Sequence, residues 1–112
     1  MTSDSEFDES LARSFVGRYV LVGVTFEDST GQFQRQEQFH GVVLSADARA
    51  GIALGLRGTR NGETQWLPPA TRPFEAAAKG SYTLRSTGEV VVDPDFTCEW
   101  LVKQSDANAS SS

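Results

Sequence analysis

A strict alternation of residue types between positions 32 and 39 restricts the fold of this chain more than any other feature. Glutamine occupies every even position, from Gln32 to Gln38, and the odd positions hold two phenylalanines, an arginine and a glutamate. Successive side chains of a β-strand point to opposite faces of a sheet. A period of two therefore predicts a half-buried strand in this part of the chain.

The apolar residues that follow this alternation change parity. Phe39 belongs to the face of the odd-numbered residues, whereas Leu44 would point to the other face of a regular strand. A β-bulge at His40 and Gly41 would absorb one extra residue, because glycine adopts the backbone angles that a bulge requires. Alternation resumes over 52–56, after a turn. We expect one long strand that bends sharply, as strands do at the corners of small β-barrels.

Most of the remaining sequence consists of short strand-like segments separated by turn residues. Turn signals at intervals of about eight to twelve residues are typical of small antiparallel β-folds. We predict a mainly β protein, a small SH3-like or Sm-like antiparallel barrel or roll with a short N-terminal helix. The expected strands cover 18–26, 32–44, 52–56, 65–67, 82–85, 89–92 and 96–102.

Three regions are expected along the chain. Residues 1–16 form an acidic segment that contains the short helix, and residues 17–104 form a single β-barrel domain. Residues 105–112 are polar and rich in serine and alanine, which predicts a disordered tail.

Two helical stretches are expected. Phe7, Leu11 and Phe15 recur at every fourth position, which predicts one apolar stripe on the N-terminal helix. A stretch from Pro73 to Lys79 contains three alanines and is followed by a glycine, so it is interpreted as one or two further helical turns.

The net charge of −5 is concentrated at the ends of the chain. Residues 1–12 carry four acids and no base, and Asp106 lies in the tail. The ten other acids balance the ten bases, all of which lie within 13–104. The barrel region thus lacks the excess of positive charge that attracts nucleic acids and acidic membranes. The composition argues against both kinds of partner.

A cytoplasmic location is expected from the residue types that the sequence lacks. A single cysteine cannot build an internal disulfide framework, and no apolar run approaches the roughly eighteen residues of a membrane span. The acidic N-terminus has no apolar core of a secretory signal. Zinc-ligand spacing, phosphate-binding loops and nucleophile motifs are not found in the sequence. We therefore expect no metal, no cofactor and no catalytic residue.

Two resemblances to known families are visible in these segments. Gly41, Asp47 and Ile52 fall at spacings similar to the first Sm motif, in which a bent strand, an Asp turn and an apolar strand follow one another. Gly51 stands where Sm proteins carry the Asn that helps to hold an RNA base, so this resemblance implies the bend and not the base-binding chemistry. The second set of segments is 19–23, 39–41, 67–69, 82–89 and 94–96 with Trp100. It resembles an uncharacterised family of small bacterial β-barrel proteins, which implies one domain and no particular activity.

His40 is the only histidine of the chain. Catalysis would require an acidic partner, for which Glu89 and Asp93 in the last hairpin are candidates. A histidine beside a bulge glycine is more often hydrogen-bonded locally, which we expect here. Cys98 shares strand parity with Trp100, and we interpret both as core side chains.

Recognition of another molecule fits the remaining candidates better than catalysis does. The glutamine face is uncharged and free of proline, so it is either a solvated surface or a sheet edge that pairs with another chain, including a second copy. Aromatic and arginine side chains elsewhere are of the types enriched at interface hot spots. The candidate binding residues are Gln34, Gln36, Gln38, His40, Trp66, Phe74 and Arg85.

These features predict a non-catalytic β-barrel module that binds a protein partner and can form a homodimer. An Sm-like nucleic-acid-binding protein is the first alternative, and it requires arginines to converge on one face. A small enzyme is the second alternative, and it requires His40 to lie beside Glu89 or Asp93 around a cleft.

Overall fold

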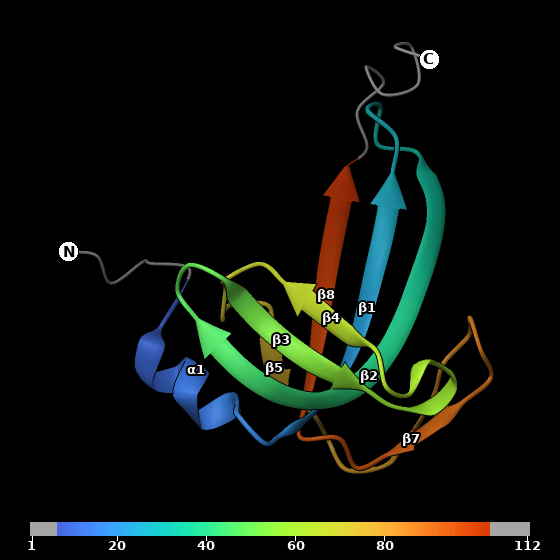
Figure 1. Ribbon diagram of the computed structural model, residues 1–112. Helices are drawn as coiled ribbons and strands as arrows, with labels where there is room; N and C mark the ends of the chain where they lie inside the picture. The colour runs from blue at the N-terminus through green and yellow to red at the C-terminus, as the bar shows by residue number, and fades with distance from the viewer. Residues whose placement is uncertain (1–6, 104–112) are drawn as a thin grey trace.

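The computed structural model describes residues 7–103 of the chain (Figure 1). A short helix is followed by eight strands, which form one six-stranded sheet in the order β4-β3-β2-β1-β8-β5 and one two-stranded sheet of β6 and β7. The elements are α1 (Glu9–Phe15), β1 (Tyr19–Glu27), β2 (Phe33–Asp47), β3 (Gly51–Leu56), the 3-10 turn η1 (Gly58–Arg60), β4 (Thr64–Leu67), β5 (Phe74–Ala76), β6 (Ser81–Thr83), β7 (Val90–Val92) and β8 (Phe96–Lys103).

The mainly β class and the short N-terminal helix predicted from the sequence are confirmed. The six strands of the large sheet do not close into a barrel, because β4 and β5 are its two ends and do not pair with each other. The expected tail, 105–112, lies outside the described residues. Within residues 7–103, no helix is long and apolar enough to cross a membrane.

β2 is a single long strand, as expected, and it belongs to two parts of the sheet. Up to Val42 it pairs antiparallel with β1, and from Gly41 onward it pairs antiparallel with β3. Figure 1 shows β2 curving from the upper right of the molecule to the lower left, where β3 and β4 cross in front of β1 and β8. This curvature makes one face of the sheet concave, and the core fills that face.

The expected bulge at His40 and Gly41 is wrong. The register between β1 and β2 runs regularly through both residues and shifts only near Phe26, while the register with β3 shifts near Leu44. Gly41 is needed for a different reason, because a Cβ atom there would lie 2.2 Å from the carbonyl oxygen of Gly55. The change of apolar parity is absorbed at Leu44, whose side chain is exposed.

The expectation of a purely antiparallel sheet is also wrong, because β8 runs parallel to β1. Parallel neighbours require a crossover of a dozen or more residues, and here all the intervening strands form that connection. The other strand pairs of the chain, including the β3–β4 and β6–β7 hairpins, are antiparallel as expected.

The helical turns expected between Pro73 and Lys79 are wrong, because this stretch contains β5. Phe74 is opposite Cys98 of β8, and its ring stacks on that of Phe15 at a centroid distance of 4.5 Å. Burial of an aromatic side chain contributes about 1.5–3 kcal/mol, which exceeds the few tenths of a kcal/mol by which alanine favours a helix.

Helix α1 covers one end of the core. The carboxylate of Asp8 caps it by accepting a hydrogen bond from the backbone N–H of Leu11 at 3.0 Å. Phe15 is fully buried and Phe7 packs against the core, but Leu11 is exposed, so the expected apolar stripe is confirmed only in part. Cys98 is buried as predicted, and Trp100 is partly buried against the same core.

Candidate functional site

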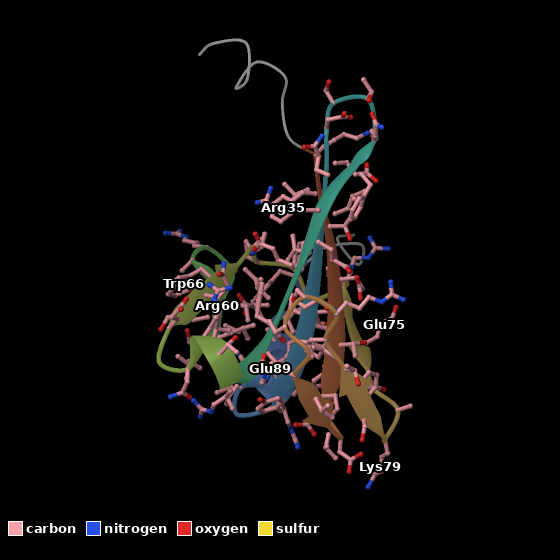
Figure 2. The ribbon with its side chains drawn as sticks, turned by 90° about the vertical axis from the view of Figure 1, so that its right-hand side faces the viewer. Arg35, Arg60, Trp66, Glu75, Lys79 and Glu89 are labelled. Carbon is pink, nitrogen blue, oxygen red and sulfur yellow. The ribbon has the colours of Figure 1, made fainter. Side chains whose placement is uncertain are left out.

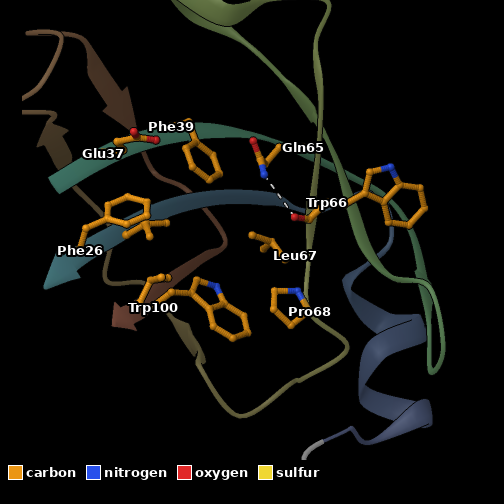
Figure 3. Close-up of a pocket in the computed structure, with 10 residues that line it drawn as sticks. Phe26, Glu37, Phe39, Gln65, Trp66, Leu67, Pro68 and Trp100 are labelled. Carbon is orange, nitrogen blue, oxygen red and sulfur yellow. Dashed lines mark hydrogen bonds between the residues drawn. The ribbon is translucent and has the colours of Figure 1, made fainter. Parts of the chain in front are cut away.

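An apolar pocket of about 220 Å³ opens on the concave face of the sheet, between β4 and the outer parts of β1, β2 and β8. Figure 3 shows the side chains around it, with Phe26, Phe39 and Trp100 on the sheet and Leu67 and Pro68 on the opposite wall. Trp66 stands at the rim, and 52% of its surface is exposed.

The register of the strands explains why these side chains meet. The parallel pairing of β1 and β8 sets Val24 beside Trp100 and Phe26 beside Val102. The antiparallel pairing with β2 sets Glu37 on the other side of Val24. Residues opposite one another in neighbouring strands point to the same face, so the pocket floor is a patch of cross-strand neighbours.

The polar groups of the pocket are few. Glu37 lines it and forms a salt bridge with Arg35 at 3.2 Å, and both side chains are about half exposed. The side-chain amide of Gln65 donates to the backbone carbonyl of Trp66 at 3.2 Å (Figure 3). The guanidinium group of Arg35 also lies 4.0 Å from the ring centre of Phe26. The pocket therefore offers mainly aromatic and aliphatic surface to a ligand.

Cys98 lies next to this pocket on β8, two residues before Trp100, which lines it. Burial raises the pKa of the Cys98 thiol to about 12, against a smaller lowering by the indole N–H of Trp100. That N–H is itself buried and makes no hydrogen bond of normal geometry within the described part of the chain. A protonated, enclosed thiol is a poor nucleophile, which agrees with the structural role that the sequence predicts for Cys98.

His40 lies on the opposite face of the sheet, which the β6–β7 hairpin covers. The residue is 6% exposed, and its Nδ1 shares a hydrogen bond of 2.5 Å with the hydroxyl of Tyr19. Burial raises the pKa of Tyr19, so the phenol keeps its proton and can donate it to Nδ1. The proton of a neutral imidazole then lies on Nε2, which faces a carboxylate oxygen of Glu89 at 3.2 Å.

Glu89 connects this histidine to the β6–β7 loop and to η1. Its carboxylate accepts hydrogen bonds from the backbone N–H of Thr59 at 2.7 Å and from the hydroxyl of Thr87 at 3.1 Å. Burial acts to raise the pKa of Glu89, but these hydrogen bonds and the one to His40 together hold it below its usual value. Gly58 has a positive φ and lies so close that a Cβ would be 2.8 Å from Nε2 of His40.

The expectation that His40 is hydrogen-bonded locally is therefore wrong, since its partners lie 21 and 49 residues away in the sequence. Of the two acids named as candidates, Glu89 reaches His40, whereas Asp93 accepts a hydrogen bond from the backbone N–H of Gly80. Tyr19, His40 and Glu89 have the order of donors that could relay a proton. The enclosed imidazole of His40 lines neither the apolar pocket beside Trp66 nor the hollow between the β6–β7 hairpin and the sheet. Its hydrogen bonds to Tyr19 and Glu89 fasten the hairpin to the sheet.

The second hollow, of about 490 Å³, lies between the hairpin and the sheet. Its lining is largely polar and includes Gln38, Tyr82, Thr97 and Glu99. Gln38 is one of the predicted binding residues, and its side-chain carbonyl accepts hydrogen bonds from the backbone N–H groups of Arg85 and Ser86. This glutamine therefore has a structural role, because it holds the loop between β6 and β7.

The structure separates the other predicted binding residues. Gln34 and Gln36 are exposed on β2, and Gln36 donates a long hydrogen bond of 3.4 Å to the hydroxyl of Thr25. Phe74 is a buried core residue and does not line the pocket beside Trp66. Arg85 has an exposed side chain on the loop that Gln38 holds, away from the pocket beside Trp66.

Sequence reasoning missed Phe26, Glu37 and Trp100 as pocket residues. The signal was present in part, because the expected strands 18–26 and 96–102 contain Phe26 and Trp100. The parallel pairing that lays those strands side by side was not expected. Within residues 7–103, no group of three or more His, Cys, Asp or Glu residues is placed to hold a metal ion.

Comparison of the chain with models of protein families, with curated proteins and with solved structures finds no match. Its function is therefore argued from its own residues.

Proposed function

We propose that this chain is a non-catalytic binding module that recognises a protein partner through the apolar pocket. The observation that carries the proposal is the combination of aromatic walls with a half-exposed Trp66 at the rim. Tryptophan is one of the residue types enriched at interface hot spots, which cluster in well-packed, desolvated pockets. A complex is stabilised when a partner removes exposed aromatic surface of this kind from water.

The size of the pocket favours one kind of occupant. Small-molecule and cofactor sites usually have volumes of about 300–1,000 Å³, and this pocket has about 220 Å³. The volume suits a single large apolar side chain inserted from a partner segment. Glu37, the one charged group of the lining, already pairs with Arg35, so the occupant needs no charge of its own.

We further propose that the fold is an open variant of the small SH3-like or Sm-like barrel, and the resemblance to small bacterial β-barrel proteins belongs to this proposal. The long curved β2 and the crossing of β3 and β4 over β1 support it. The pocket lies in the interval between those two parts of the sheet, where a closed barrel would be filled by side chains.

A phage-displayed library of random peptides tests the binding proposal. We expect selected peptides to share one large apolar residue and to lose at least about tenfold in affinity against Trp66→Ala, which corresponds to about 1.4 kcal/mol. Leu44→Ala is the matched control, because Leu44 is equally exposed and does not line the pocket. Peptides that bind both variants as tightly as the parent protein would contradict the proposal.

A further inference from the structure

The first part of β2 has one edge that no other strand covers. Residues 33–42 pair with β1, and the pairing with β3 begins only at Gly41. Within the described residues, no strand lies against the other side of 33–39. Figure 2 views the molecule from this side, with Arg35 on the upper part of the strand and Glu89 near its lower part.

The backbone of this edge is oriented for pairing. Val43 exchanges backbone hydrogen bonds with Gly17 and Arg18. The backbone N–H and C=O groups of the odd-numbered residues of β2 therefore point toward β1. The carbonyl of His40 accepts a hydrogen bond from the backbone N–H of Arg57, so the backbone groups of the even-numbered residues point away from β1. The N–H and C=O groups of Gln36 and Gln38 consequently point outward from the uncovered edge. Such an edge is a template for another strand.

We propose that two copies of this chain join through this edge, with their β2 strands antiparallel and centred on Gln36. In that register each Arg35 lies directly opposite the partner's Glu37, so the symmetric pair contains two cross-strand ion pairs. Arg35 and Glu37 are non-hydrogen-bonded positions of such a ladder, where side chains approach most closely.

The charges of Arg35 and Glu37 also favour this register over the two neighbouring registers. Centring the pair on residue 35 places two arginines opposite each other, and centring it on residue 37 places two glutamates opposite each other. Like charges in direct opposition destabilise a strand pair. At the lower end the loop held by Gln38 limits the free edge, so the ladder is short.

The symmetry has a consequence for the apolar pocket. A twofold axis perpendicular to the joined sheet keeps the odd-numbered side chains of both copies on one face. Glu37 lines the pocket on that face, so the partner's Arg35 lies at the pocket rim. The two pockets then open on the same side of a continuous sheet. This pairing does not depend on what the pocket binds.

Sedimentation equilibrium of the full chain tests the proposal. A single short edge buries less surface than the roughly 1,200–2,000 Å² of stable interfaces, so we expect self-association in the range of about 10 µM to about 1 mM. Arg35→Glu and Glu37→Arg should each weaken it at least about tenfold, because like charges then meet across the axis. The double variant that exchanges both charges should restore it.

Two further variants separate edge pairing from other effects. Gln36→Pro removes an outward N–H without removing a bond to β1, so it should give a monomer that keeps its melting temperature. Trp66→Ala should leave the self-association unchanged. This result would distinguish pairing through the β2 edge from binding at the pocket. A chain that stays monomeric at about 1 mM, single variants that associate like the parent, or a double variant that is not restored would each overturn the proposal.

Discussion

The two halves of β2 continue one alternating pattern but have opposite surroundings. Residues 33–38 are exposed or partly exposed and are hydrogen-bonded on one side only. Residues 39–43 are largely buried, and from Gly41 onward the strand has β3 on the side opposite β1. The alternation determines which way each side chain points. The neighbouring strands determine which half of the strand is sensitive to substitution.

Gly41→Val is expected to have the largest effect, because it lies in the enclosed half. Its Cβ would lie 2.2 Å from a backbone oxygen of β3, which cannot move without shifting the strand. We expect a loss of at least about 3 kcal/mol in the free energy of unfolding, measured by urea denaturation. Gly23→Ala is the control, since its Cβ meets only the flexible carboxylate of Glu99 at 3.1 Å, and it should cost less than about 1 kcal/mol. Equal stability of both variants would contradict the close approach of β3.

His40→Ala should have the next largest effect. The substitution leaves a cavity and removes the hydrogen-bond partner of Tyr19 and of Glu89 in a largely enclosed place. We expect a loss of about 2–4 kcal/mol in the same denaturation measurement. Tyr19→Phe removes one of the two hydrogen bonds and should cost about 1 kcal/mol. A loss below about 0.5 kcal/mol for His40→Ala would show that the imidazole does not fasten the hairpin.

The pH dependence of stability should report on Glu89. Its pKa in the folded protein lies below the usual value of 4.5, so the folded state favours the carboxylate. The resulting stabilisation is present above pH 4.5 and is lost as the pH falls through the folded pKa. Glu89→Gln should reduce the change in melting temperature between about pH 5 and pH 3 relative to the parent.

The parent curve also contains contributions from Asp28 and Asp47, whose pKa values are lowered by hydrogen bonds from Thr30 and from the backbone of Ala50. The difference between the parent and Glu89→Gln isolates one carboxylate. Parallel curves for the two proteins would contradict a lowered pKa at Glu89.

Arg35→Ala should have the smallest effect on stability, because Arg35 lies in the exposed half of β2. Its salt bridge with Glu37 is half exposed, and such pairs contribute about 0–1 kcal/mol. We expect a change within about 0.5 kcal/mol in urea denaturation of the dilute, monomeric protein. A loss above about 1.5 kcal/mol would remove the contrast between the two halves of the strand.

Local patterns predicted the strands and several turns, because alternation and turn residues act over a few positions. The expected strands 18–26 and 96–102 correspond to β1 and β8, and the expected strands 82–85 and 89–92 correspond to the paired β6 and β7. The local patterns failed at Phe74, where packing on Phe15 outweighs local helix propensity.

The site could be predicted only in part, for a related reason. Trp66 was identified from its residue type alone, whereas its pocket depends on which distant strands lie beside one another. His40 and Glu89 were named together, but only the fold shows Tyr19 on the other ring nitrogen. No local pattern encodes a contact across 49 positions.

The parallel pairing of β1 with β8 has a consequence for the way the protein is made. One of the two neighbours of β1 is β8, so β1 lacks this neighbour until residues 96–103 have been synthesised. Contacts between such distant segments slow folding, because a long loop must close before they form. Until β8 emerges from the ribosome, one edge of β1 stays unpaired, and such unpaired edges make growing chains prone to aggregation.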